Sequence, residues 1–194
     1  MSDFMLQALQ EAEAAAARGE VPVGAVLVSV SGEVLARSGN AVEALADPTA
    51  HAEVLVLRAA ARRQGTPRLA PCVLYVTLEP CAMCAAAISL ARVTRVVFGA
   101  YDPKGGAVEH GPRFFTQPTC LHAPEVIGGV EERRASALLK AFFDPKRGPS
   151  LERAGWSPKK SQRHKGPLAE NACLPVTSGV PGGPSSSVGR ASDL

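Results

Sequence analysis

The sequence predicts an α/β fold with three layers, in which helices cover both faces of a central mixed sheet of about five strands. Two observations carry this prediction. Short runs rich in Val and Leu alternate with longer segments that have the composition and periodicity of helices. Gly and Pro residues separate these segments, as expected where one element ends and the next begins.

The first half of the chain is expected to form a helix, a β-hairpin and a second helix. These elements are assigned to residues 3–18, 21–30, 33–38 and 50–63. Ala, Leu and Glu dominate the first helix, which Gly19 closes. The run 21–30 is apolar and β-branched, and the turn Ser31-Gly32 leads back into the second strand, 33–38. The second helix follows the loop ending in Asp47-Pro48-Thr49 and stops before Gly65.

The second half is expected to alternate strands with helices. These elements are assigned to residues 72–78, 80–91, 94–98, 125–128 and 131–143. Pro80 can begin a helix because proline is tolerated in a first turn. Residues 99–119 form a Gly/Pro-rich loop, and Asp144-Pro145 stops the last helix. Strands separated by helices favour parallel pairing, so the strands from residue 72 onward should run parallel.

The composition changes at residue 148, which divides the chain into a folded domain (1–147) and a tail (148–194). Gly, Pro and Ser make up 21 of the 47 tail residues, and no hydrophobic period is present. We therefore expect the tail to be disordered. Residues 1–147 hold 15 Lys and Arg against 15 Asp and Glu, so the net charge of +3 lies in the tail. Any nucleic-acid site in the folded domain must be a local patch.

The lengths of the apolar runs and the number of cysteines indicate the cellular compartment in which the protein is found. No apolar run approaches the length of a membrane span, and the N-terminus lacks a secretory pattern. The five cysteines are odd in number, and three of them are scattered, so a disulfide framework is not expected. We therefore expect a cytoplasmic protein that does not associate with membranes.

Two short motifs carry the chemistry: His51-Ala52-Glu53 and Pro80-Cys81-Ala82-Met83-Cys84. One His and two Cys can hold zinc by three protein ligands and leave the fourth tetrahedral position open, as in catalytic sites. Cys81 and Cys84 share one face of a helix at its first turn, where the helix dipole favours thiolates. Glu53 is not needed as a ligand, so it is free to act as a general base and then a general acid. Zinc-dependent nucleobase deaminases carry this combination.

Other interpretations of each motif fit less well. C-x-x-C alone is also found in redox pairs and in halves of zinc ribbons. A ribbon needs a second C-x-x-C, which the sequence lacks, and a redox pair needs neither His51 nor Glu53. Glu53 could also serve as a dipole partner at the start of its helix, which is compatible with proton transfer.

Longer segments resemble the bacterial tRNA-specific adenosine deaminases, which have the cytidine-deaminase-like fold. The matching segments are EVPVGAVLV (20–28), Gly39-Asn40, DPTAHAE (47–53), LYVTLEPCAMC (74–84) and RVVFGAYDPKGGA (95–107). The resemblance spans about residues 3–147. It implies hydrolytic deamination of adenosine to inosine at the wobble position of the tRNA anticodon. It also implies a homodimer that binds the anticodon stem-loop, with one Zn²⁺ per subunit.

The resemblance also implies residue roles. His51, Cys81 and Cys84 become the zinc ligands, and Glu53 becomes the proton shuttle. Asn40 would hydrogen-bond the flipped-out base, with the backbone at Ala52 and Pro80 beside it. From the residues alone, Asn40 is almost equally well explained as a turn residue after Gly39. Candidate RNA contacts are Lys104, Arg113, Phe142, Phe143, Lys146 and Arg147.

Three departures from the family pattern bear on RNA binding and packing. Ala86 stands where the family commonly has Gly. Asp144-Pro145 stops the last helix where relatives often continue with several basic residues. The loop 112–124 also differs, and its Arg113 and aromatic residues are expected to pack under the loop unless they contact RNA.

The same signature leaves two other functions open. A guanine or cytidine deaminase acting on free bases or nucleosides would use the same zinc and glutamate, because pocket shape decides the substrate. A zinc-bound scaffold that only binds RNA would usually have lost the acid/base residue, and Glu53 is present.

Overall fold

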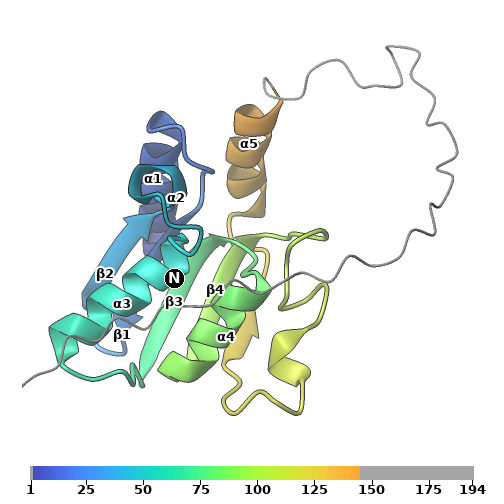
Figure 1. Ribbon diagram of the computed structural model, residues 1–194. Helices are drawn as coiled ribbons and strands as arrows, with labels where there is room; N and C mark the ends of the chain where they lie inside the picture. Colours follow the sequence, from blue (N-terminus) through green and yellow to red (C-terminus); the bar gives the residue numbers. More distant parts are fainter. Residues whose placement is uncertain (1, 145–194) are drawn as a thin grey trace, which may run out of the picture. The chain divides into compact units, whose positions relative to one another are not determined.

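The computed structural model describes residues 2–144, which form a five-stranded mixed sheet with helices on both faces (Figure 1). The elements are α1 (Ser2–Ala17), β1 (Gly24–Ser29), β2 (Val34–Gly39), α2 (Val42–Leu45), α3 (Ala52–Gln64), β3 (Cys72–Leu78), α4 (Ala82–Ala91), β4 (Arg95–Ala100), the 3₁₀ turn η1 (Phe114–Thr116), β5 (Glu125–Ile127) and α5 (Glu132–Phe143). The predicted three-layer α/β/α fold is confirmed.

The strands lie in the order β2-β1-β3-β4-β5. The predicted hairpin is confirmed, because β1 pairs with β2 antiparallel. The predicted parallel pairs are confirmed as well, since β3, β4 and β5 run parallel to one another. Pairing of β1 with β3 is antiparallel and joins the two halves, with Ala25 opposite Val76.

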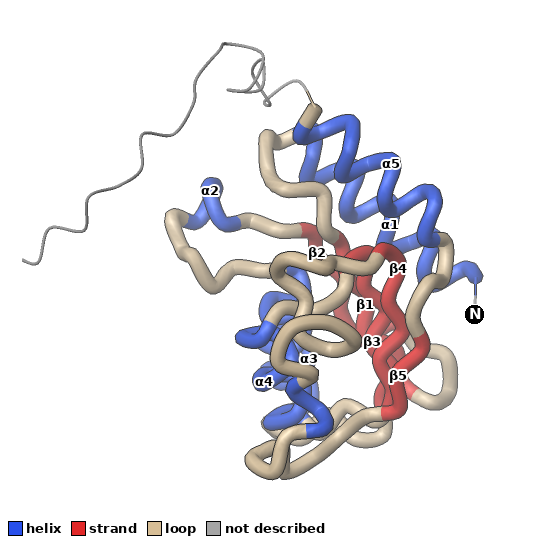
Figure 2. Tube along the Cα trace, turned by 90° about the vertical axis from the view of Figure 1, so that its right-hand side faces the viewer, coloured by secondary structure: helices blue, strands red, loops and turns tan. Residues whose placement is uncertain are grey.

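Side-chain alternation along the strands divides the core between the two faces. Ala25 and Leu27 of β1 pack into the cluster shared with α3 and α4, while Val26 and Val28 pack with Met5 of α1. Helices α1 and α5 accordingly cover one face, and α3 and α4 cover the other (Figure 2). Because α3 and α4 pack on the same face, their N-termini can meet at one end of the sheet.

Two local features differ from the sequence-based expectation. The loop after β2 contains the short helix α2, whose backbone N–H groups at Glu43 and Ala44 donate to the buried Glu20 carboxylate. Helix α4 begins at Ala82 rather than at Pro80, so Cys81 is its N-cap residue. Cys81 has extended backbone dihedrals and pairs with Gly106 in an isolated bridge, and these contacts delay the start of the helix.

Gly24→Ala is expected to lower the free energy of unfolding by about 3 kcal/mol, near the upper end of overpacking costs. Helix α1 crosses β1 so closely that a Cβ at Gly24 would collide with the Ala8 carbonyl oxygen and lie 2.5 Å from the Ala12 nitrogen. Urea denaturation followed by circular dichroism measures the change. Gly32→Ala is the control, because open space surrounds Gly32 and only its φ of +86° makes alanine costly. An equal loss in both variants would contradict close packing of α1 on β1.

Several sequence-based expectations fall outside the described part of the chain. They concern the disordered tail over 148–194 and the RNA contacts at Lys146 and Arg147. Within residues 2–144, no helix is long and apolar enough to cross a membrane.

Candidate metal centre and substrate pocket

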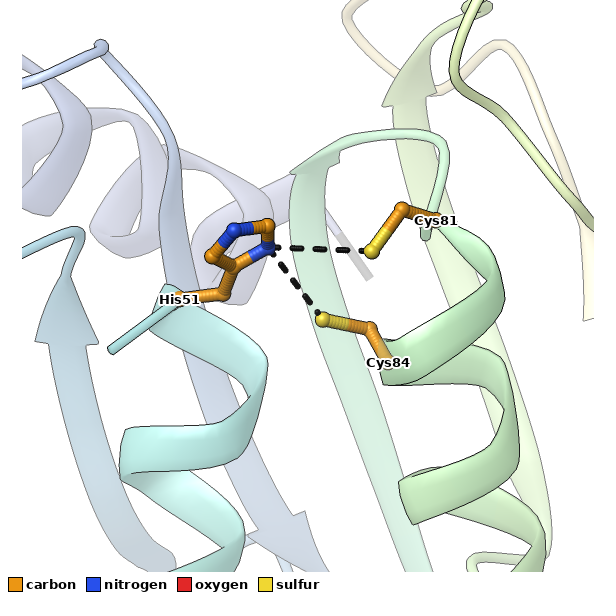
Figure 3. A group of neighbouring side chains, drawn as sticks. All are labelled: His51, Cys81 and Cys84. Atoms are coloured by element: carbon orange, nitrogen blue, oxygen red, sulfur yellow. Dashed lines mark hydrogen bonds between the residues drawn. The ribbon is translucent and has the colours of Figure 1, made fainter. Parts of the chain in front are cut away.

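Helices α3 and α4 present three potential metal ligands at one point (Figure 3). His51 is the N-cap residue of α3, Cys81 is the N-cap residue of α4, and Cys84 lies in the first turn of α4. Their ligand atoms all lie within 4.8 Å of one another. The three residues singled out in the sequence are therefore neighbours in space, although 30 positions separate His51 from Cys81.

The donor atoms have the spacing that zinc requires. His51 Nδ1 lies 3.7 Å from Cys81 Sγ and 3.5 Å from Cys84 Sγ. A tetrahedral zinc with ordinary Zn–N and Zn–S bond lengths separates a nitrogen from a sulfur ligand by about 3.6 Å. One imidazole and two thiolates form a donor set typical of catalytic zinc, with one position left for a fourth ligand. The residues therefore fit zinc without rearrangement.

The electrostatics of the cluster favour a thiolate. A hydrogen bond from the Cys84 thiol, together with one from His51, lowers the pKa of Cys81 to about 4. The hydrogen bond that it gives to Cys81, together with burial, raises the pKa of Cys84. Both thiols are deprotonated when they coordinate a metal ion. Their position at a helix N-terminus stabilises this negative charge.

Glu53 places a carboxylate beside this cluster. It lies in the first turn of α3, two residues after His51, with a side chain only 3% exposed. Burial raises the pKa of its carboxyl group. Among residues 2–144, no hydrogen-bond partner reaches its Oε2 atom. A buried oxygen without a partner is costly unless a ligand or reactant occupies the space next to it.

Asn40 is held in a fixed orientation at the same site. Its side-chain oxygen accepts a hydrogen bond of 2.8 Å from the Ala52 backbone N–H, and the residue is 6% exposed. The Ala52 N–H that the sequence placed near the base is therefore engaged by Asn40. With the oxygen anchored to Ala52, the amide NH₂ group of Asn40 offers two donors to a ligand.

A pocket of about 570 Å³ opens over these residues. Asn40, His51, Glu53 and Cys81 line it, and Phe142 and Phe143 at the end of α5 line it as well. Two of the expected RNA contacts lie elsewhere: exposed Lys104 is on the loop beside the pocket, and Arg113 donates to the Glu109 carbonyl at 3.1 Å. Pro80 is buried behind the pocket, where its carbonyl accepts the Ala107 N–H.

Sequence reasoning missed several residues of the pocket wall. Glu20 and Glu79 are both 2% exposed and line the pocket, and Asp102 and Glu43 join them. Glu20 and Glu79 lie within the segments EVPVGAVLV and LYVTLEPCAMC, so their positions were visible. Their function was not, because both bind backbone amides of segments distant in sequence.

This fold and site define a zinc-dependent deaminase. The sequence model of the cytidine and deoxycytidylate deaminase zinc-binding region matches residues 1–100. Among curated relatives, the tRNA-specific adenosine deaminase of Agrobacterium fabrum is 58% identical over 144 residues, covering 74% of this chain and 94% of the relative. The corresponding enzyme of Bacillus subtilis is 47% identical over 140 residues, covering 72% of this chain and 86% of the relative. The chain belongs to the tRNA-specific adenosine deaminase family.

Solved structures agree with this assignment. One structure comes from work on A-to-I editing by tRNA:A34 deaminases at the wobble position of transfer RNA. It has a TM-score of 0.70 and is 57% identical in sequence, and the match covers 72% of this chain and 100% of the chain in that structure. A guanine deaminase from Nitrosomonas europaea has a TM-score of 0.66 at 23% identity, covering 74% of this chain and 84% of its own. At that identity it supports the shared fold alone.

Proposed function

We propose that the protein deaminates adenosine to inosine at the wobble position of a tRNA anticodon, with zinc as its metal. The observation that carries the proposal is the convergence of His51, Cys81 and Cys84 beside the buried Glu53, in a member of the tRNA-specific adenosine deaminase family. The pocket above these residues is large enough for one nucleobase. A base held in an anticodon loop must leave its stack to enter such a pocket.

Glu53 is the proton carrier of the proposed reaction. Zinc held by His51, Cys81 and Cys84 would supply an acidified water at neutral pH, with a pKa of roughly 7. Glu53 takes the proton of the attacking water and delivers it to ring nitrogen N1 of adenine. The water oxygen bonds to C6 of adenine, Glu53 carries the second proton of that oxygen to the amino group, and the C6–N bond then breaks to release ammonia. Adenosine and water thus become inosine and ammonia, and the glutamate returns to its starting state.

Asn40 is proposed to orient the base. The hydrogen bond from Ala52 anchors the side-chain oxygen of a residue that lines the pocket, and the NH₂ group can then donate to an acceptor on the purine ring. Phe142 and Phe143 are proposed to contact the nucleotides next to it, because both line the pocket and aromatic rings stack on unpaired bases. Lys104 and Arg113 are exposed and are proposed as contacts with the more distant RNA backbone.

The test compares substrates on one protein sample. Purified protein is incubated in parallel with a tRNA carrying adenosine at the wobble position, the same tRNA with guanosine there, free guanine and cytidine. We expect inosine in the first tRNA alone, with one zinc per subunit measured on the same sample. Ammonia from guanine or cytidine without inosine in tRNA would instead establish a free-base or nucleoside deaminase. Binding of tRNA without any product would identify an RNA-binding scaffold.

The homodimer is proposed on the basis of the family and of an apolar groove between α3 and α4. The groove is lined by Val54, Leu57, Arg58, Ala61, Pro67, Leu69, Ala87, Leu90 and Ala91. Leu90 is 75% exposed and adjoins the other apolar side chains of the groove, so together they form an exposed apolar patch. A second copy of the chain covering this groove would bury it.

Leu90→Glu is expected to separate the proposed dimer into monomers. A charge buried without a partner costs about 3 kcal/mol or more, which raises the dissociation constant by roughly 100-fold. Sedimentation velocity over a concentration series measures the shift. Val30→Glu is the control, because Val30 is equally exposed at 72% but lies at the hairpin turn after β1. A wild-type protein that sediments as a monomer would contradict the dimer, and a dimer unchanged by Leu90→Glu would place its interface elsewhere.

Removal of residues 148–194 is expected to leave the folded domain and its zinc intact. The sequence places all expected helices and strands before residue 144, and the metal ligands lie between residues 51 and 84. The zinc content and melting temperature of a chain ending at residue 147 should therefore match those of the full chain. Aggregation or loss of zinc on truncation would show that the tail is structural.

We also propose a cytoplasmic location, where tRNA is available as substrate.

A further inference from the structure

Glu79 is a buried carboxylate to which the proposed reaction assigns no task. It follows directly after β3 and stands two residues before Cys81. Its side chain is 0% exposed, and it forms part of the pocket wall. Burying a carboxylate is costly unless hydrogen bonds replace the lost water. The donors that satisfy Glu79 therefore indicate what it does.

All five of these donors belong to one loop, residues 102–110. Oε1 accepts the backbone N–H groups of Val108 (3.1 Å), Glu109 (2.8 Å) and His110 (2.9 Å). Oε2 accepts the backbone N–H of Asp102 (3.0 Å) and the His110 Nδ1 group (2.8 Å). One carboxylate thus fixes both ends of the loop and serves as its centre.

The same loop reaches both the pocket and the metal centre. Asp102 and Gly105 line the pocket. Gly106 pairs with Cys81 in an isolated bridge, and the Ala107 N–H donates to the Pro80 carbonyl at 2.9 Å. The loop passes so close to Glu79 that a Cβ at Gly106 would lie 2.5 Å from the Glu79 carboxyl carbon. A displaced loop would therefore alter the pocket wall and the backbone beside a zinc ligand together.

We propose that Glu79 is a positioning residue, whose carboxylate holds the loop 102–110 in the conformation that shapes the substrate pocket beside Cys81. This inference rests on the proposed deaminase function for its kinetic consequences. Its structural consequence, order in the loop, is independent of any substrate. Glu79 acts through the loop backbone and takes no part in proton transfer.

Glu79→Gln tests the proposal, because glutamine has almost the same shape but replaces one acceptor oxygen by an NH₂ donor. If the NH₂ group replaces Oε1, three of the five hydrogen bonds are lost. If it replaces Oε2, the bond from the Asp102 N–H is lost and His110 must change tautomer to keep its contact. We expect hydrogen–deuterium exchange in peptides spanning 102–110 to become at least roughly tenfold faster. We also expect kcat/KM on wobble-adenosine tRNA to fall by about 100-fold, the cost of a displaced site, at unchanged zinc content.

Three further variants complete the experiment. Glu109→Gln makes the same charge change on the loop 102–110 itself. Because the Glu109 side chain is exposed, loop exchange and kcat/KM should stay as in the wild type. His110→Ala removes one donor to Glu79, whereas His110→Asn keeps an N–H donor on a similar branch. We expect faster loop exchange and roughly tenfold lower kcat/KM in the alanine variant, and recovery of both in the asparagine variant.

The outcomes separate the two proposals. Unchanged loop exchange and kcat/KM in Glu79→Gln would overturn the positioning role. If Glu79→Gln does not fold, His110→Ala and His110→Asn test the positioning role instead. Identical loop exchange and identical kinetics in these two variants would overturn that role. A residue that supports stability alone would lower the melting temperature without changing kcat/KM at lower temperature. A wild-type protein inactive on tRNA would refute the proposed function, while the exchange measurements would still test Glu79.

Discussion

Replacement of Glu53 by glutamine is expected to reduce turnover of wobble-adenosine tRNA by about 10²–10⁴-fold while zinc stays bound. Glutamine keeps the size and one carbonyl oxygen of the side chain but cannot accept a proton. The proposed ligands His51, Cys81 and Cys84 are untouched, so the metal content should remain at one per subunit. Single-turnover kinetics with excess enzyme isolate the chemical step, and metal analysis is done on the same preparation.

Stability provides a second readout for this variant. Glu53 is 3% exposed and its Oε2 atom has no hydrogen-bond partner within residues 2–144, so burial of the charge is unfavourable. The neutral amide should therefore not lower the melting temperature. Glu13→Gln, at an exposed position on α1, is the control for loss of a carboxylate. Undiminished turnover in Glu53→Gln would refute the proton-transfer role, and loss of zinc with turnover would assign Glu53 to metal retention.

Replacement of Cys84 by serine is expected to remove both zinc and activity. In the proposed site three protein ligands hold the metal, and serine is a poor substitute for a thiolate on zinc. Cys84 Sγ lies 3.5 Å from His51 Nδ1, and the residue is fully buried, so its thiolate is expected to be a central ligand of the site. Mutation of residues that hydrogen-bond to metal ligands typically lowers metal affinity by 10–100-fold, so loss of a ligand itself should lower it by more than about 100-fold.

Metal analysis after dialysis against a weak chelator, together with the tRNA assay, measures this effect. Cys120→Ser is the matched control, because Cys120 is a half-buried thiol that contacts Ser89 and the His122 carbonyl away from the metal centre. The control should retain one zinc per subunit and full turnover. Full zinc content in Cys84→Ser would mean that the metal is held by a different set of residues, and the site would have to be reassigned.

Local sequence features predicted most of the elements correctly. The runs 72–78 and 94–98 are β-branched and apolar, and they became β3 and β4 with small changes at the ends. Gly65 stops α3 in a left-handed conformation, as its place after a helical segment indicated. These predictions succeeded because chain conformation here follows from neighbouring residues, through propensity and capping.

Other features depend on contacts between segments far apart in the sequence. Nothing local places β1 between β2 and β3, and the sequence-based order left that antiparallel pairing open. Helix α2 was missed because its four residues have no helical period, and the buried Glu20 holds its first turn. Cys81 was assigned to the helix itself, whereas pairing with Gly106 keeps it extended.

The sequence by itself determined the chemistry of this protein, because the kinds of ligand and the spacing of Cys81 and Cys84 belong to one short segment at a helix N-terminus. The sequence also indicated His51 as the third ligand, but only the tertiary structure shows how His51 reaches the two cysteines. That meeting depends on α3 and α4 packing on the same face of the sheet, which no local pattern encodes. The tertiary structure likewise decided that the Asn40 side chain accepts the Ala52 N–H and that the Glu79 carboxylate accepts N–H groups from the loop 102–110. A buried polar group forms hydrogen bonds with whichever backbone groups the fold brings close to it.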